Sequence, residues 1–207
     1  HGRLTGTGRI GKTPIFEKKM AVIIFDAAKN CLEESNLERK IQLSKETAKR
    51  AKQAYVIEKL ADWTEPKVGR PIKPALVSPH ALPKRGIGTE QGKYSLIHAI
   101  AHIEFNAINL AFDAIYRFQD MPEEYYWDWL QVAGEETNHF ILLRRHLNNG
   151  NYEYGDFDAH NGLWDMAKQT ANDALDRMAI IPRVLEARGL DVTPAMIKKF
   201  AHIGETG

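Results

Sequence analysis

The residues that offer chemistry most directly are Glu136 and His139, within the segment YYWDWLQVAGEETNHFILLRRHL. At the period of an α-helix, Glu136 falls on an otherwise apolar stripe of Trp129, Val132, Ala133, Phe140, Leu143 and Leu147. His139 follows three residues later, so both side chains leave the same side of the helix. An ionised carboxylate on an apolar face is costly unless it is paired or binds a cation. The spacing therefore indicates an oxygen and a nitrogen ligand for one metal ion, and the alternative is a chance pair on a solvated face.

Two further carboxylates interrupt apolar stripes on predicted helices. Glu104 lies in a helix predicted from Thr89, its N-cap, to about Phe118, and Glu186 lies in a helix predicted from about Leu163 to Arg188. Their apolar neighbours at helical spacing are Ile97, Ala101, Ile108, Ala111 and Ile115 for the first, and Leu175, Met178, Ala179 and Pro182 for the second. Pro182 is expected to kink that second helix.

Together Glu104, Glu136, His139 and Glu186 make up most of a dinuclear metal site. In a four-helix bundle such a site takes one Glu from each of two helices and a Glu-x-x-His from each of the other two. Two divalent cations would be neutralised by the carboxylates, and the imidazole suits iron, with manganese or zinc as alternatives. The sequence thus predicts an all-α protein with two divalent metal ions as cofactors.

Two other patterns could carry chemistry but are interpreted otherwise. His98 and His102 have metal-ligand spacing on a second, polar stripe with Asn106, Asn109 and Asp113, and we favour structural, hydrogen-bonded histidines over a separate metal site. The string from Gly6 to Thr13 matches a phosphate-binding loop but lacks the strand before it and the helix after it. No nucleotide is therefore expected.

The chain divides into four predicted regions. Residues 1–19 are expected to be a non-native or disordered extension, 20–61 a helical pair packed outside the bundle, 62–88 a proline-rich connector, and 89–207 the helical bundle. The short link between the helices of Glu104 and Glu136 makes them antiparallel neighbours.

Composition narrows the range of functions. The formal net charge of +1 gives no general attraction for nucleic acid, and the mixed charges of residues 37–61 are interpreted as a solvated face. The single cysteine, Cys31, excludes an intramolecular disulfide and suits a reducing compartment. No apolar run reaches membrane-spanning length. A cytoplasmic protein without membrane or nucleic-acid partners is expected, and a homo-oligomer is left open.

The same residues carry a resemblance to a known family. The runs HAIAHIEFNAINLAFDAIYRF, YYWDWLQVAGEETNHFILLRRHL and GDFDAHNGLWDMAKQTANDALDRMAIIPRVLEARGLDVTP resemble an uncharacterised bacterial family of ferritin-like proteins over about residues 65–204. That family lies in the superfamily of rubrerythrin and the di-iron tRNA hydroxylases. The resemblance implies a ferritin-like four-helix bundle with extra N-terminal helices, in which Glu104, Glu136, His139 and Glu186 are the metal ligands. It implies no substrate.

One departure from the family pattern concerns the last helix. The pattern ends with a second Glu-x-x-His, whereas the residues near the end read His202-Ile203-Gly204-Glu205, which is the reverse order. Because three ligand-bearing faces would otherwise open to water, we expect the natural chain to continue past Gly207 with the missing bundle helix.

Three functions remain in competition at this stage. The first is an oxidoreductase that uses a di-iron or iron–manganese centre to activate oxygen or peroxide. The second is metal binding or storage without turnover. The third is a structural helical module in which the buried glutamates pair with arginines, for which the candidates are Arg117, Arg144, Arg177 and Arg183.

Overall fold

The computed structural model describes residues 21–50, 52–83 and 85–181, and these are mostly helical, as predicted. The main helices are α1 (Ile24–Glu33), α2 (Leu37–Lys49), α3 (Glu90–Arg117), α4 (Glu123–Asn149) and α5 (Gly162–Gln169), and residues 174–181 are also helical. Two short strands, β1 (Val22–Ile23) and β2 (Tyr55–Val56), pair in parallel, and single 3₁₀ turns occur at η1 (Lys52–Ala54) and η2 (Pro79–Ala81).

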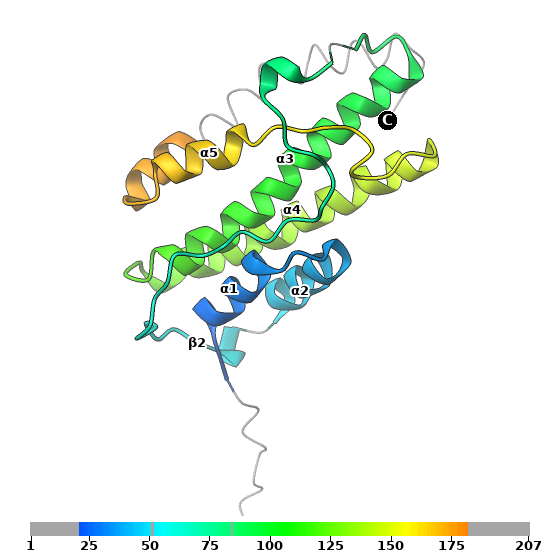
Figure 1. Cartoon of the computed structure of the whole chain (residues 1–207). Coiled ribbons are helices and arrows are strands. Elements are labelled where there is room, and N and C mark those ends of the chain that lie inside the picture. The colour runs from blue at the N-terminus through cyan, green and yellow to red at the C-terminus, as the bar shows by residue number, and fades with distance from the viewer. Residues whose placement is uncertain (1–20, 51, 84, 182–207) are drawn as a thin grey trace, which may run out of the picture.

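Helices α3 and α4 form a long antiparallel pair at the centre of the molecule (Figure 1). The Thr89 side chain accepts a hydrogen bond from the Gly92 backbone N–H and caps α3, as the sequence predicts. A short turn reverses the chain before α4, and it includes Gln119, Asp120, Met121 and Pro122. The predicted spans of 90–118 and 124–148 agree with the observed helices to within one residue at each end.

Helices α1 and α2 pack against one side of this pair, α1 on α3 and α2 on α4 (Figure 1). Their apolar faces are deeply buried, with Ile24, Phe25 and Leu32 of α1 fully shielded from solvent. The edge of the Phe25 ring meets Tyr126 of α4, with 5.2 Å between the ring centroids. These two helices therefore share one continuous hydrophobic core with α3 and α4.

The connector between β2 and α3 runs along the surface of the helices instead of forming elements of its own, apart from η2 (Figure 1). The Gly69 backbone N–H donates to the Leu32 carbonyl at the end of α1, and a Cβ at this position would overlap the carbonyl oxygens of Glu33 and Glu34. Further along, Leu76 makes a backbone bridge to Ala159. Backbone hydrogen bonds thus attach the connector to the end of α1 and to the loop that follows α4.

The predicted helix from about Leu163 to Arg188 is wrong as a continuous element. The structure ends α5 at Gln169, turns through residues 170–173, and resumes a helix at 174. The Asp173 side chain accepts from the backbone N–H groups of Leu175 and Asp176, which caps a new helix, and the Thr170 hydroxyl bonds back to the Ala167 carbonyl. Pro182 and its expected kink, Glu186, and the expectations for residues 1–19 and for the end of the chain lie outside the described residues.

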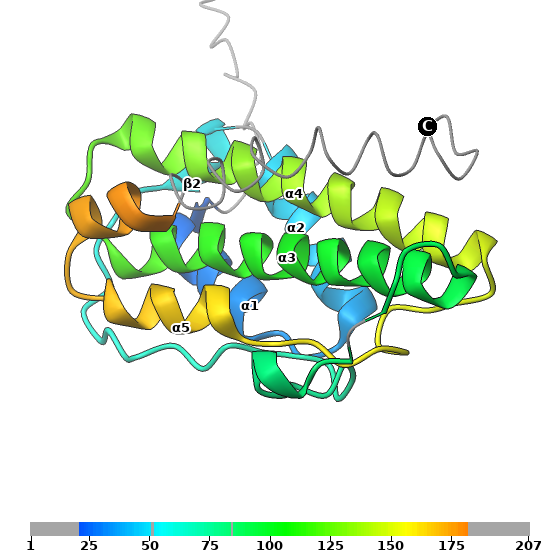
Figure 2. The ribbon, with the colours of Figure 1, turned by 90° about the horizontal axis from the view of Figure 1, so that it is seen from above.

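Seen from above, α3 lies between α4 on one side and α5 on the other (Figure 2). With α1 also packed against it, α3 has neighbours around most of its circumference, and every residue from Phe105 to Tyr116 is buried. Both stripes of α3, the apolar one with Glu104 and the polar one, are therefore placed for contact with other parts of the chain.

Candidate metal centre

The polar stripe of α3 faces into the protein, although its composition resembles a solvent-facing surface. Its five members, His98, His102, Asn106, Asn109 and Asp113, are all buried. The Nε2 atom of His98 accepts from the Gly155 backbone N–H, and Nδ1 of His102 shares a hydrogen bond of 2.9 Å with the Tyr154 hydroxyl. Burial lowers the pKa of both imidazoles to about 4, so they are neutral at pH 7. Each imidazole thus makes a hydrogen bond within the chain, as predicted, while Nδ1 of His98 and Nε2 of His102 are buried without a partner among the described residues.

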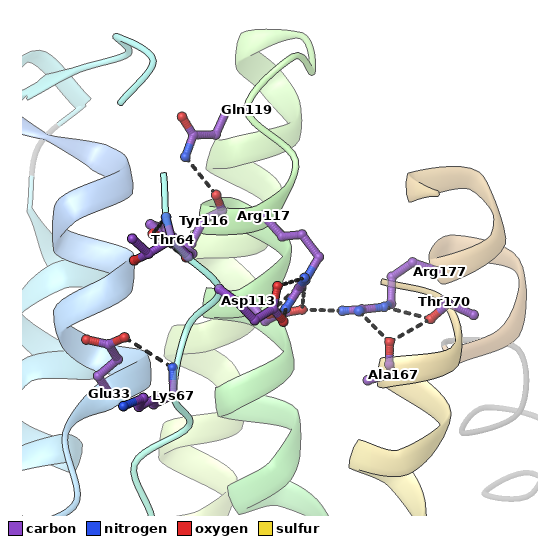
Figure 3. A network of polar contacts seen from close by, with 11 residues as sticks. Glu33, Thr64, Lys67, Asp113, Tyr116, Arg117, Gln119, Ala167, Thr170 and Arg177 are labelled. Atoms are coloured by element: carbon purple, nitrogen blue, oxygen red, sulfur yellow. Dashed lines mark hydrogen bonds and ion pairs between the residues drawn. The ribbon is translucent and has the colours of Figure 1, made fainter. Parts of the chain in front are cut away.

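Asp113 is the centre of a buried ionic network (Figure 3). Its carboxylate accepts hydrogen bonds from Arg117, one turn further along α3, and from Arg177, with Arg177 Nη1 only 2.6 Å from Oδ2. Arg177 also donates to the Thr170 hydroxyl and the Ala167 carbonyl at the end of α5. Arg117 reaches outward to Glu65 of the connector. One carboxylate thus joins α3, α5, the 174–181 helix and the connector.

Lys40 is a second buried charge that contacts the polar stripe. Its side chain is only 1 % exposed, and its ammonium donates to the carbonyls of Cys31 and Leu32 and to the Asn109 side chain. Burial lowers its pKa to about 7. The ammonium therefore satisfies carbonyls in the last turn of α1, where a positive charge also complements the helix dipole.

The predicted ligands Glu104 of α3 and Glu136 and His139 of α4 come together where the two helices pack against each other. Each residue offers one ligand atom, and these three atoms lie within 4.8 Å of one another. The His139 Nδ1 atom lies 3.1 Å from Oε2 of Glu136. Among the described residues, this is the group of acidic and histidine side chains whose ligand atoms lie close enough together to hold one metal ion. Glu186, the fourth predicted ligand, lies outside the described residues.

Burial within this group decreases from Glu104 through Glu136 to His139. Glu104 is half-buried, the Glu136 side chain is 23 % exposed, and the His139 side chain is 55 % exposed. The sequence predicts that these residues converge inside one core, whereas the structure places His139 at the rim, in reach of solvent. The imidazole of the group is therefore more exposed to solvent than its two carboxyl groups.

The pKa of Glu104 is set by its burial and by its neighbour Glu136. Burial, together with the hydrogen bond and the negative charge of Glu136, raises the pKa of Glu104 to about 8. Two carboxyl groups this close cannot both ionise cheaply, so Glu104 retains its proton at neutral pH. A bound cation would replace that proton and hold both groups ionised.

The arginines proposed as partners of the glutamates are used elsewhere. Arg117 and Arg177 bind Asp113, and Arg144 pairs with Glu38 and Glu153. Within the described ranges, no arginine forms an ion pair with Glu104 or Glu136. Arg183 lies outside these ranges.

Sequence reasoning missed the partners of the polar stripe. The sequence places Asp113 on a polar face and predicts that Lys40 belongs to a solvated, charged face. It predicts Arg177 as a candidate partner of the glutamates. A usable signal lies in α3 itself, where Ala, Ile, Leu and Phe occupy every position from Ala107 to Ile115 apart from Asn109 and Asp113. A helix that is apolar on most of its circumference is buried on most of it.

Comparison with known proteins places the chain in a family. The family described as "Protein of unknown function (DUF455)" matches residues 33–207, and the chain belongs to it. A protein of Haemophilus influenzae (strain ATCC 51907 / DSM 11121 / KW20 / Rd), named "Uncharacterized protein", is 53% identical over 139 residues, which cover 64% of this chain and 48% of that protein. The chain thus spans about half the length of that relative. No solved structure matches the chain. In the described residues, no helix combines the length and apolarity needed to cross a membrane.

Proposed function

We propose that this member of the DUF455 family is a metal-binding protein of the ferritin-like kind, with Glu104, Glu136 and His139 as ligands of a divalent transition-metal ion. The observation that carries the proposal is the convergence of two carboxyl groups and one imidazole within 4.8 Å, on two adjacent helices. Helices α3 and α4 would then be two of the four helices of the bundle, and the site would lie between them.

The donor set fits such an ion. Carboxylate oxygen with imidazole nitrogen suits iron, manganese or zinc, with iron first. Partial burial and the proximity of the two carboxyl groups disfavour two negative charges without a counter-ion, as the raised pKa of Glu104 indicates. A divalent ion supplies that counter-charge. Glu186 is proposed as a further ligand, and a second ion would need ligands beyond the three described here.

For the activity, we propose an oxidoreductase that activates oxygen or peroxide at a di-iron or iron–manganese centre. The metal would supply the redox chemistry when bound. The contribution of the chain is to bind and orient it through Glu104 and Glu136, and to leave the His139 side of the site accessible to a small molecule.

Elemental analysis of protein purified without chelator tests the binding proposal. We expect iron, manganese or zinc in wild-type protein and its loss in Glu136→Ala. The matched control is Glu135→Ala, which removes an exposed carboxylate one residue away that bonds only to Gln131 in the described residues. Equal metal content in wild type and both variants would overturn the proposed ligands.

A second measurement separates catalysis from storage. Protein loaded anaerobically with Fe(II) is mixed with oxygen or peroxide, and the oxidant consumed is compared with the bound iron. Catalysis predicts repeated consumption when a reductant is supplied, with no more than two ions per chain. Storage predicts a single oxidation per iron and uptake well beyond two ions per chain.

A further inference from the structure

An open cleft lies between the end of α2 and the adjacent face of α4, and its volume is about 480 Å³. The two helices pack closely at its floor, where a Cβ at Gly134 of α4 would lie 3.0 Å from the Cβ of Ala48 on α2. Gly134 and Glu136 are about 200° apart around α4 at 3.6 residues per turn. None of Glu104, Glu136 and His139 lines the cleft. The cleft is therefore on the opposite side of α4 from the candidate metal centre.

The α2 wall of the cleft is basic. Its four cationic side chains come from the last turns of α2 and the residues that follow, and they are Lys45, Lys49, Arg50 and Lys52. All but Lys45 are exposed, and in the described part of the chain none of the four forms an ion pair. Lys52 lies over the Trp127 ring and Arg50 over the Tyr55 ring, at 5.3 Å and 5.6 Å from the centroids. These ring contacts do not neutralise the charges.

The α4 wall carries two carboxylates, Asp128 and Glu135, which compensate the basic wall only in part. Among the described residues no ion pair joins the two walls, and Glu135 accepts a hydrogen bond from Gln131 of its own helix. Four cations against two carboxylates leave a surplus of two positive charges. The dipole at the C-terminus of α2 offsets only about half a charge. The lining therefore favours an anion with a charge close to that surplus.

The size and the other lining residues restrict the chemistry of that anion. The volume falls within the range of about 300–1,000 Å³ that is usual for small-molecule sites. A phosphate monoester carries a charge of about −1.5 to −2 at pH 7, and its oxygens accept hydrogen bonds from several cations at once. Trp127 and Leu130 supply apolar surface for an organic body, while the amides of Gln131 and Asn138 can bond to its hydroxyl groups.

The distribution of charge along α2 disfavours a nucleic acid as the ligand. A strand needs cations that follow its backbone over several nucleotides. The cations of the cleft are confined to residues 45–52. Towards the start of α2, Arg39 lies 3.9 Å from Glu34, and Glu38 binds Arg144 of α4. The charges there are balanced within the chain, so the basic surface does not continue along the helix.

We infer that this cleft binds a small phosphate monoester with a hydroxylated organic body, the phosphate on the basic wall of α2 and the body against α4. Lysine ammonium groups on flexible stems can each turn a donor towards a phosphate oxygen, and the Arg50 guanidinium can donate to two oxygens at once. The ligand would lie between α2 and α4, and its binding would not depend on a metal ion at the candidate metal centre.

The test is isothermal titration calorimetry of the full chain with glucose 6-phosphate in a phosphate-free buffer. We expect one saturable site with a dissociation constant in the high micromolar to millimolar range, as suits a small ligand in an open cleft. Glucose, which lacks the phosphate, should show no saturable binding. The double variant Lys49→Gln/Arg50→Gln should weaken binding by about tenfold or more. The matched control is Lys168→Gln, which removes an exposed lysine of α5 outside the cleft and should bind as wild type does.

A second variant tests the cleft without changing its basic wall. Gln131→Trp fills the cleft from the α4 side, so it should abolish glucose 6-phosphate binding while inorganic phosphate still binds weakly. Inorganic phosphate that binds wild type as tightly as glucose 6-phosphate would overturn the monoester as ligand. A single-stranded oligonucleotide that binds more tightly than both would overturn the small-molecule class. Absence of glucose 6-phosphate binding to wild type, or equal binding to Lys49→Gln/Arg50→Gln, would overturn the site.

Discussion

Within helix α3 the carboxyl groups of Glu104 and Asp113 lie nine residues apart, and their surroundings differ in opposite ways. Asp113 is fully buried and is neutralised by Arg117 and Arg177. Glu104 is only half-buried, yet in the described part of the chain no arginine forms an ion pair with it, and the charged group that acts on it is another carboxyl group, Glu136. The more deeply buried group is thus the better compensated one.

This difference separates a structural charge from a candidate functional one. A buried charge whose partners are supplied by the same chain holds elements together, as Asp113 does for α3, the connector and the segment after α5. A carboxyl pair left without a counter-charge raises the free energy of the folded protein, and that cost is relieved when an external cation binds. In the ionic network the counter-charge for a buried carboxylate comes from arginines of the chain. At the proposed metal site it would come from a bound metal ion.

The largest effect is expected from Asp113→Asn. The substitution keeps the shape of the side chain but leaves Arg117 and Arg177 without their shared negative charge. Removing one partner of a buried ionic network costs about 3–5 kcal/mol of unfolding free energy. Urea denaturation of the variant measures this loss, with Asp128→Asn on the exposed face of α4 as the control. A loss below about 1 kcal/mol would mean that the network contributes little to stability.

A change of opposite sign is expected from Glu104→Gln in metal-free protein. The pKa of Glu104 is about 8 in the folded chain against an ordinary value of 4.5. Between these values the unfolded state has lost its proton and the folded state retains it, so the stability of the wild type falls as pH rises. The variant lacks this titration.

The stability of Glu104→Gln minus that of wild type should therefore grow between pH 5 and pH 8, by about 1–3 kcal/mol after allowance for solvent screening. Paired denaturation curves at several pH values measure it, and the difference removes the contributions of other titrating groups such as His98 and Lys40. A difference that stays constant with pH would show that Glu104 ionises normally and would remove the electrostatic argument for the site.

The smallest effect is expected from Glu65→Gln, at the outer end of the Asp113 network. The Glu65 side chain is 66 % exposed, although it binds Arg117 through two hydrogen bonds. Ion pairs at such exposed positions contribute about 0–1 kcal/mol. Thermal denaturation at low and high salt should show a small loss that disappears in salt. A loss as large as that of Asp113→Asn would mean that the whole network acts as one unit.

The sequence was sufficient for the parts of the molecule in which local pattern decides the structure. The spans of α3 and α4, the Thr89 cap and the proximity of Glu104, Glu136 and His139 all follow from helical periodicity and one short turn. The break at residues 170–173 was missed because the apolar periodicity of the predicted helix outweighed the capping preference of Asp173.

The polar stripe of α3 could not be placed in the same way, because its partners come from distant segments. Lys40 is 69 residues from Asn109, and Arg177 is 64 residues from Asp113. A polar residue on a helix has the same local pattern whether it faces water or a buried partner, and only the tertiary arrangement distinguishes the two.

The central claim is that Glu104, Glu136 and His139 bind a metal ion, and titration of metal-free protein with Co(II) tests it most directly. Co(II) reports oxygen and nitrogen ligation through its visible absorption and stands in for the other divalent metals. We expect saturable binding to wild type, weakened about tenfold to a hundredfold in His139→Ala and abolished in Glu136→Ala, with Glu135→Ala unchanged. Binding of equal strength in wild type and Glu136→Ala, or no binding to wild type at pH 8, would contradict the account.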